Sequence, residues 1–343
     1  MRLLLSYDIL PLTIFGSKDP GVWNRLVMDM NQSLLKVILI SILAVFSIII
    51  ILIQTRNLIA AGRLLKEKQD ALDNELIKTA ELEARAQNLT ESLVYAQRIQ
   101  EALLPSEEYF RKHFSDSFIF FKPKDIVSGD FYWIGEKDDK VIVVAADCTG
   151  HGVPGALMSM LGHEIIEKTI NEDNIYKPAA ILEILNKALE KTFSREKNIG
   201  TIIRDGMDIG LCVVDKKRRK LEYSGAFFPL YLIRENTLTE IKGDKIIIGM
   251  NPEGRKYSSQ EIDIEPDDIV YIFSDGYVDQ FGGNDFKKFM YRRFRYLLTR
   301  IHSFPVNDQK AILEENINSW MAGHPQLDDM MVLGFRPLSR GSK

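Results

Sequence analysis

The sequence predicts an α+β layered sandwich, preceded by a membrane-spanning helix and a long coiled-coil helix. Three observations carry this prediction. A charge-free apolar run lies in the first 60 residues, and a proline-free stretch rich in Glu, Lys, Ala and Leu follows it. In the rest of the chain, short β-rich runs alternate with helical ones. With 343 residues the chain has room for about two domains.

The apolar run extends from Val37 to Ile53 without a charged residue. Together with Leu34 and Leu35 it gives about 20 residues, which at ~1.5 Å per residue cross a hydrocarbon layer of ~30 Å. The run ends without a small-residue cleavage site, so it fits a cleaved signal peptide poorly. We therefore predict a short N-terminal segment over residues 1–32 and a transmembrane helix over residues 34–55.

Basic residues flank this run on both sides, with a slight excess after it. Because loops rich in Lys and Arg stay on the cytoplasmic side, the excess places the downstream part of the chain there. The residues after the run are Arg56, Arg63, Lys66 and Lys68, and those before it are Lys18, Arg25 and Lys36.

Residues 57–105 are predicted to form a coiled-coil signalling linker, which Pro105 ends. Apolar residues recur at heptad spacing in two runs that are one step out of phase, which indicates a local break in the register. A long helix cannot bury such a stripe alone, so a parallel homodimer is expected; the alternative is a helix folded back on its own domain. The stripe consists of Leu65, Leu72, Leu76, Leu82, Ala86, Leu89, Leu93, Ala96 and Leu103.

The last domain, residues 106–343, contains the alternating strands and helices. Several strands are apolar on both faces, which is typical of strands covered by helices or by a second sheet. The predicted strands are Phe131–Ile134, Val141–Ala146, Ile209–Val214, Lys220–Gly225, Leu230–Arg234, Ile269–Phe273 and Met330–Phe335. The predicted helices are Val153–Ile170, Pro178–Phe193, Asp285–Arg300 and Asn307–Met321.

Four separate segments of this domain place an aspartate beside glycine or at the end of a β-like run. One such aspartate would be an ordinary turn residue. Several carboxylates that converge in an apolar setting repel one another and lose hydration, so they need a compensating positive charge. The segments are VSGDFYW with Asp130, VVAADCTGHG with Asp147, VYIFSDGYVD with Asp275, and QLDDMMVLGF with Asp328 and Asp329.

Divalent cations supply this charge most simply, because no lysine or arginine directly flanks Asp130, Asp147 or Asp275. Oxygen-only ligands favour Mg²⁺ or Mn²⁺ over zinc. Four carboxylates balance two such ions. A pair of ions about 3.5–4 Å apart lowers the pKa of a bridging water and directs the hydroxide at phosphorus. The pattern therefore predicts a phosphate-ester hydrolase site with two Mn²⁺ or Mg²⁺ ions.

The same segments resemble, in order, the four signature blocks of the metal-dependent protein phosphatases, the protein phosphatase 2C-like family. Over about residues 95–337 they resemble the bacterial branch that contains the sporulation stage II phosphatase E and regulators of sigma-factor partner switching. The resemblance implies a four-layer α-β-β-α sandwich with two ions between its sheets. It also implies hydrolysis of phosphoserine or phosphothreonine in a protein.

The resemblance also implies roles for single residues. Asp147 would bridge both ions, and the backbone carbonyl of Cys148 would bind one of them. The family often has glycine or valine at the latter position, and a carbonyl ligand tolerates any side chain there. The remaining ligands would be Asp130, Asp275 and Asp328, with Asp329 either a ligand or a support for one.

Other candidate residues each have an ordinary structural interpretation beside the functional one. Asp208, with Asp205, either binds a third metal or belongs to a turn before a strand. His151 is a candidate to protonate the leaving group, but it lies four residues after Asp147, where eukaryotic members have a histidine two residues after; the alternative is a structural role at a helix start. Lys122 and Lys124 either contact the substrate phosphate or are solvated.

These observations predict a membrane-anchored, metal-dependent phosphoprotein phosphatase that acts in bacterial signalling by partner switching. The expected location is the bacterial inner (cytoplasmic) membrane, crossed once, with the catalytic domain in the cytoplasm. The substrate that the branch implies is a phosphorylated anti-sigma-factor antagonist domain. The alternative is a catalytically silent phosphatase-like module that binds phosphoproteins.

Other classes fit less well. A net charge of −4 without a concentrated basic face argues against a nucleic-acid binder. A sensor kinase needs a phosphoacceptor histidine in the linker, and residues 58–117 contain only His113, outside the predicted helix. We further expect helix register in the linker to bias the helix that begins at Val153, close after Asp147.

Overall fold

The computed structural model describes residues 19–194, 205–251 and 254–338. It divides into two compact units, residues 1–86 and residues 87–343. Most of the predicted segment 1–32 therefore lies outside the described residues. The first unit consists, in its described part, of one helix, α1 (Pro20–Leu103), whose remainder belongs to the second unit.

The apolar part of α1 is long and hydrophobic enough to cross a membrane. Its most apolar 18-residue window has a mean hydropathy of 3.1, and none of that window is buried within the protein. The helix continues through the predicted linker without a break and ends at Leu103, two residues before Pro105. A continuous helix therefore connects the apolar segment with the second unit.

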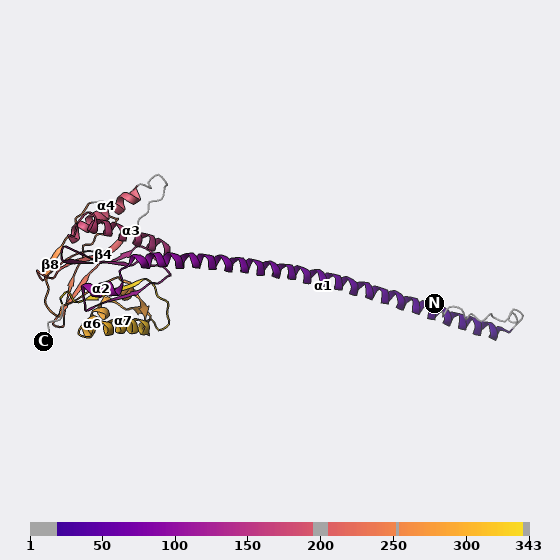
Figure 1. Ribbon diagram of the computed structural model, residues 1–343. Helices are drawn as coiled ribbons and strands as arrows, with labels where there is room; N and C mark the ends of the chain where they lie inside the picture. The colour runs from indigo at the N-terminus through magenta and orange to yellow at the C-terminus, as the bar shows by residue number, and fades with distance from the viewer. Residues whose placement is uncertain (1–18, 195–204, 252–253, 339–343) are drawn as a thin grey trace. The chain divides into compact units, whose positions relative to one another are not determined.

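The second unit is an α+β domain with two five-stranded antiparallel sheets (Figure 1). The first sheet has the order β1 (Ser117–Lys122), β12 (Met330–Phe335), β9 (Ile269–Phe273), β6 (Leu230–Arg234) and β7 (Thr237–Ile241). The second has the order β2 (Phe131–Lys137), β3 (Lys140–Cys148), β4 (Met207–Asp215), β5 (Lys220–Ala226) and β8 (Gln260–Asp263). A small hairpin joins β10 (Phe281–Gly282) to β11 (Lys287–Lys288).

Six further helices complete the described part of the chain. The short ones are α2 (Glu107–His113) and α5 (Gly276–Asp279). Two of the longer ones, α3 (Gly152–Asn171) and α4 (Pro178–Ser194), pack on the second sheet, whereas α6 (Tyr291–Ile301) and α7 (Val306–Met321) pack on the first. Figure 1 shows these two helix pairs on opposite sides of the domain.

The alternation of side chains along the strands produces three hydrophobic cores. In β3, Val141, Val143 and Ala145 join a core that takes side chains from both sheets. Their neighbours Ile142 and Val144 face the other way, toward α3 and α4. This follows from the two-residue period of a strand, and it explains why β3 is apolar on both faces.

Two tight hairpins fix the register of neighbouring strands. Asp138 and Asp139 connect β2 to β3, and Glu235 and Asn236 connect β6 to β7; all four residues have positive φ. Two-residue loops with positive φ at both positions match the twist of antiparallel strands. The register of β2 on β3 in turn decides which residues meet at the far end of the sheet.

The seven predicted strands are all present, with ends shifted by at most three residues. One predicted helix was wrong at its start: the Asp285–Arg300 segment becomes helical only at Tyr291. The preceding residues form β11 and its turn, with positive φ at Phe286 and Met290. Strands β1, β7 and β8 were not predicted.

Candidate active site

The predicted aspartates gather where strands of the two sheets begin or end. Asp130 directly precedes β2, and Asp147 lies at the end of β3; the pairing of Phe131 with Ala146 makes them neighbours. In the other sheet Asp275 follows β9 and Asp328 precedes β12. These two segments are joined by a 3.1 Å hydrogen bond from the Ser274 amide to the Met331 carbonyl. The fold thus brings together carboxylates that are up to about 200 residues apart.

Exposure differs across this aspartate cluster. Asp130 is 1% exposed, Asp147 is half-buried, and Asp275 and Asp328 are exposed. The cluster therefore has a buried part at Asp130, which we call its floor, and a solvent-exposed part at Asp275 and Asp328, which we call its edge. The edge is open to solvent, while the floor is shielded from water.

Burial and mutual repulsion raise the carboxyl pKa values in the cluster. Burial raises the pKa of Asp130 well above its usual value, and the charge of Asp147 adds to this, whereas a hydrogen bond with Ser274 opposes it. The pKa of Asp147 is raised by burial and then by Asp275, Asp328 and Asp208. These groups are costly to ionise together without a cation.

Asp208 belongs to the same cluster. It lies on β4 directly opposite Asp147 on β3, and like charges at opposed positions destabilise a sheet. Burial followed by the charge of Asp275 raises the pKa of Asp208 to about 6. Burial, followed by Asp279 and Asp328, raises that of Asp275 to about 6 as well.

The residues fit a hard divalent cation. All the charged donors in the cluster are carboxylate oxygens, which Mg²⁺ and Mn²⁺ prefer. Oδ2 of Asp130 is buried and has no hydrogen-bond partner within the described chain. Among the described residues no three His, Cys, Asp or Glu side chains stand in a complete ligand arrangement.

Asp329 differs from its neighbour Asp328 in what it contacts. Its Oδ1 accepts a hydrogen bond from the Lys124 amide, and its Oδ2 accepts one from the Gly129 amide, both at 2.7 Å. It is buried, and its own amide donates to Oδ1 of Asp328 at 2.9 Å. Asp329 therefore fixes the backbone that leads to Asp130, and it orients Asp328.

Close backbone packing behind the cluster depends on glycine. A Cβ at Gly155 would lie 2.3 Å from the Gly150 carbonyl oxygen, and one at Gly129 would lie 2.7 Å from the same atom. The start of α3 can therefore approach the segment before Asp130 only because these positions lack side chains. Gly150 and Gly152, in the Asp147 segment, have positive φ instead, which glycine adopts without strain.

His151 and the two lysines lie at the edge of the cluster. His151 precedes α3, and its Nδ1 is 2.7 Å from Oδ2 of Asp125; the ring is half exposed. Nζ of Lys122 donates to Oδ1 of Asn318 on α7 at 2.8 Å, so it is engaged away from the cluster. Lys124 is close enough to lower the pKa of Asp328, against the larger raising effect of burial.

Cys148 is buried, and burial and the surrounding aspartates raise its thiol pKa well above the usual value. Its side chain packs in the core between the second sheet and α3 and α4. The thiol is therefore a protonated core group, and only the backbone of this residue is available to the site.

Sequence reasoning missed Gln100, the one buried residue of α1. Its Nε2 donates to the Ser128 carbonyl at 2.6 Å and to Oγ of Ser159 at 2.8 Å, and its Oε1 accepts from the Ser128 amide at 3.0 Å. The signal was present, because Gln100 occupies the heptad position between Ala96 and Leu103. A polar residue in an apolar stripe indicates a specific partner.

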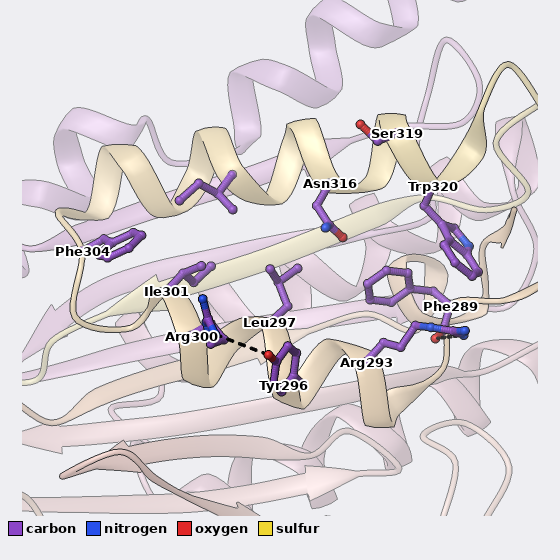
Figure 2. Close-up of a pocket in the computed structure, with 11 residues that line it drawn as sticks. Phe289, Arg293, Tyr296, Leu297, Arg300, Ile301, Phe304, Asn316, Ser319 and Trp320 are labelled. Carbon is purple, nitrogen blue, oxygen red and sulfur yellow. Dashed lines mark hydrogen bonds between the residues drawn. The ribbon is translucent and has the colours of Figure 1, made fainter. Parts of the chain in front are cut away.

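A separate cavity of the described chain lies away from the aspartate cluster. It has a volume of ≈720 Å³ and lies between α6 and α7, where Figure 2 shows Arg293, Tyr296 and Arg300 on one helix facing Asn316 and Trp320 on the other. None of the clustered aspartates lines it. The candidate active site is therefore at the exposed edge of the aspartate cluster, and not in this cavity.

Solved structures share this fold. The SiaA-PP2C domain of Pseudomonas aeruginosa is 34% identical, with a TM-score of 0.68 over 74% of this chain and 98% of that domain. The PP2C phosphatase domain with a regulatory fragment of SpoIIE from Bacillus subtilis is 16% identical, with a TM-score of 0.51 over 64% of this chain and 62% of that one. The second unit is thus a PP2C-type phosphatase domain by its fold.

The family follows from the sequence match. Residues 137–337 match the family described as Stage II sporulation protein E, and the chain belongs to this family. Phosphoserine phosphatase RsbU of Bacillus subtilis (strain 168) is 24% identical over 200 residues, which are 55% of this chain and 54% of RsbU. The chain therefore spans about half the length of this curated relative.

Proposed function

We propose that this chain is a membrane-anchored, metal-dependent phosphatase that hydrolyses phosphoserine or phosphothreonine in a protein. The observation that carries the proposal is the aspartate cluster. Carboxylates from four separate segments meet at one end of a PP2C-type domain, and one buried oxygen among them, Oδ2 of Asp130, has no hydrogen-bond partner among the described residues. The RsbU match, a phosphoserine phosphatase, supports the same class of reaction.

In this proposal Asp130, Asp147, Asp275 and Asp328 hold two Mn²⁺ or Mg²⁺ ions, together with the carbonyl of Cys148. Asp208, opposite Asp147, is placed to contribute to a third site. Bound divalent ions supply a water of lowered pKa as nucleophile and stabilise negative charge on the phosphoryl group.

The chain's own groups position the reactants and move protons. Asp329 supports the ligands, because both of its oxygens are already used by backbone amides. His151, oriented through Nδ1 by Asp125, keeps Nε2 free to carry a proton to the departing serine oxygen. Lys124 is the better placed of the two lysines to meet the phosphate, since Lys122 is bound to Asn318.

The architecture proposed for the whole chain follows the sequence prediction. The three hydrophobic cores support a four-layer α-β-β-α sandwich in which two sheets lie between two helix pairs. The apolar part of α1 supports a single membrane crossing over residues 34–55. Its exposed heptad leucines support a parallel homodimer in the linker, and a phosphorylated anti-sigma-factor antagonist domain is the proposed substrate.

The test is hydrolysis by the full chain in detergent, with p-nitrophenyl phosphate and a phosphoserine protein as substrates. We expect turnover with Mn²⁺, loss of turnover with EDTA, and a loss of more than about 100-fold in Asp147→Asn, since substitution of a residue that only supports a metal ligand already costs about 10–100-fold. Asp173→Asn, an exposed aspartate after α3, is the matched control. Turnover that survives both EDTA and Asp147→Asn would overturn the two-metal proposal.

A further inference from the structure

A second hollow, which we call the flank pocket, lies beside the aspartate cluster. It has a volume of ≈320 Å³ and lies between the turn after β5, strands β6 and β7, and the start of α6. The residues that matter here are Phe227, Tyr231, Lys242, Lys245, Tyr291 and Arg295.

Backbone pairing places this pocket next to the aspartates on two sides. Phe227 forms an isolated parallel bridge with Ile209, the residue directly after Asp208. On the other side the Met290 amide, next to Tyr291, donates to the carbonyl of Val278 at 2.7 Å, in the short helix that starts after Asp275. A few residues of extended chain, at about 3.3–3.6 Å each, therefore suffice to connect the aspartate edge with the pocket.

Phe227 is held at the pocket in a strained conformation. It has φ of 55°, and the Phe228 amide donates to the Ala226 carbonyl at 2.7 Å, so Phe227 is the centre of a γ-turn. A γ-turn with positive φ is rare and costly for a residue with a side chain. The ring is nevertheless 45% exposed and not packed in the core. Strain that keeps an aromatic ring in solvent indicates a recognition role.

Tyr231 supplies an unused polar group to the same pocket. The residue is fully buried, and its hydroxyl has no hydrogen-bond partner within the described part of the chain. Buried hydroxyls nearly always have a partner, and an unsatisfied one costs about 1–3 kcal/mol. A hydrogen-bonding group of a bound molecule would remove this cost.

The positive charges around the pocket favour an acidic ligand. Lys242 and Lys245 are exposed, and no ion pair joins either to a described residue. Arg295 pairs with Glu240, N–O 3.1 Å, so the pocket keeps an excess of positive charge beside a strongly acidic cluster. An acidic peptide segment with one apolar side chain complements this surface, the acid at the lysines and the apolar group at Phe227.

We propose that the flank pocket binds an acidic segment of the phosphoprotein substrate, a few residues from the phosphoserine, and so contributes to substrate choice. This inference rests on the phosphatase function proposed above. Lys242 and Lys245 attract the acidic side chains, and the Tyr231 hydroxyl donates to an oxygen of the segment. These residues take no part in hydrolysis itself, so a small aryl phosphate does not use them.

The test compares two phosphoserine peptides of equal length, one flanked by Asp and Glu and the other by Gly and Ser. With the full chain and Mn²⁺, we expect kcat/KM to favour the acidic peptide by about tenfold, through KM. Lys242→Ala with Lys245→Ala should reduce this preference to about twofold or less, and leave p-nitrophenyl phosphate hydrolysis unchanged. Tyr231→Phe, which keeps the ring, should raise KM for the acidic peptide alone.

The matched control is Lys187→Ala with Lys191→Ala, two exposed lysines on α4, which should keep the preference. A wild-type chain without preference, or a preference that persists in the Lys242 and Lys245 double variant, would overturn the inference. If no phosphate ester is hydrolysed, the phosphatase proposal fails by itself. Anisotropy of the two fluorescent peptides, measured in EDTA, then decides the binding claim: equal affinities would reject it.

Discussion

Gln100 offers the sharpest test of how α1 is joined to the phosphatase domain. Its amide group makes three hydrogen bonds, two with the backbone of Ser128 and one with the Ser159 hydroxyl. Ser128 lies two residues before Asp130, so the bonds connect the helix with the floor of the aspartate cluster. Gln100→Ala removes all three bonds at once.

The expected loss can be worked from these contacts. After substitution, the Ser128 amide loses its partner in a buried place, and the Ser128 carbonyl keeps only a long 3.4 Å contact with the Ser159 hydroxyl, which also contacts the Ala156 carbonyl at 2.9 Å. Each buried group without a partner costs about 1–3 kcal/mol. Some water will enter the space left by the shortened side chain, so we expect the free energy of unfolding to fall by about 2–4 kcal/mol.

Urea denaturation of the full chain in detergent, followed by near-UV circular dichroism, measures this loss. Gln87→Ala is the matched control: Gln87 lies on the same helix and is exposed, and its Nε2 donates to Oε1 of Glu91 at 3.1 Å on the helix surface. Its effect should stay within about 0.5 kcal/mol. Equal midpoints for the two variants would refute the reasoning, because Gln100 would then carry no more stability than a solvated glutamine.

Three further predictions concern the linker, the acidic cluster and its support. One alanine inserted between Leu93 and Ala96 rotates the upstream helix by about 100° and should change phosphatase activity several-fold. A four-residue insertion adds about one turn and should change the activity less. Equal kinetics in the two insertion variants would contradict this prediction. Without divalent cations, the free energy of unfolding should fall as pH rises from about 4 to about 6, because the raised pKa of Asp208 means that the folded chain holds a proton which the unfolded chain has released. Mn²⁺ at pH 7 should restore the lost stability. A melting temperature that does not change with pH would count against the argument. Asp329→Asn should lower the free energy of unfolding by about 2–4 kcal/mol. The Asn side chain keeps one accepting oxygen, and its Nδ2 cannot accept, so one of the two backbone amides loses its partner. An unchanged urea midpoint would argue otherwise.

The fold class was predictable because the strands carry strong local signals. The α+β class and strands such as β3 and β9 are confirmed. They were predictable because five or more consecutive apolar residues bounded by polar ones strongly favour a buried strand. The start of α6 was not predictable from periodicity, because Lys287–Lys288 pairs with Phe281–Gly282 through a contact that no local pattern records. Weakly apolar edge strands such as β8 were missed for a related reason: their pairing partner defines them.

The members of the aspartate cluster were predictable from the sequence, and their arrangement was less so. The aspartate segments could be found because each follows or precedes a buried strand, and the sheets then bring those strand ends together. The different contacts of Asp328 and Asp329 could not be read from two adjacent letters. They depend on amides of Lys124 and Gly129, about 200 residues earlier. The metal-binding roles, the dimer and the membrane crossing stay predictions.

The place of β12 in its sheet has a consequence for biosynthesis. This strand leaves the ribosome after the other strands of its sheet, yet it lies between β1, from the start of the domain, and β9. Until Met330–Phe335 emerges, β1 has no neighbour on that side and Asp329 cannot reach the amides it holds. A nascent chain in which α1 has already folded can therefore still lack an assembled aspartate cluster, so assembly of the cluster waits for the synthesis of β12.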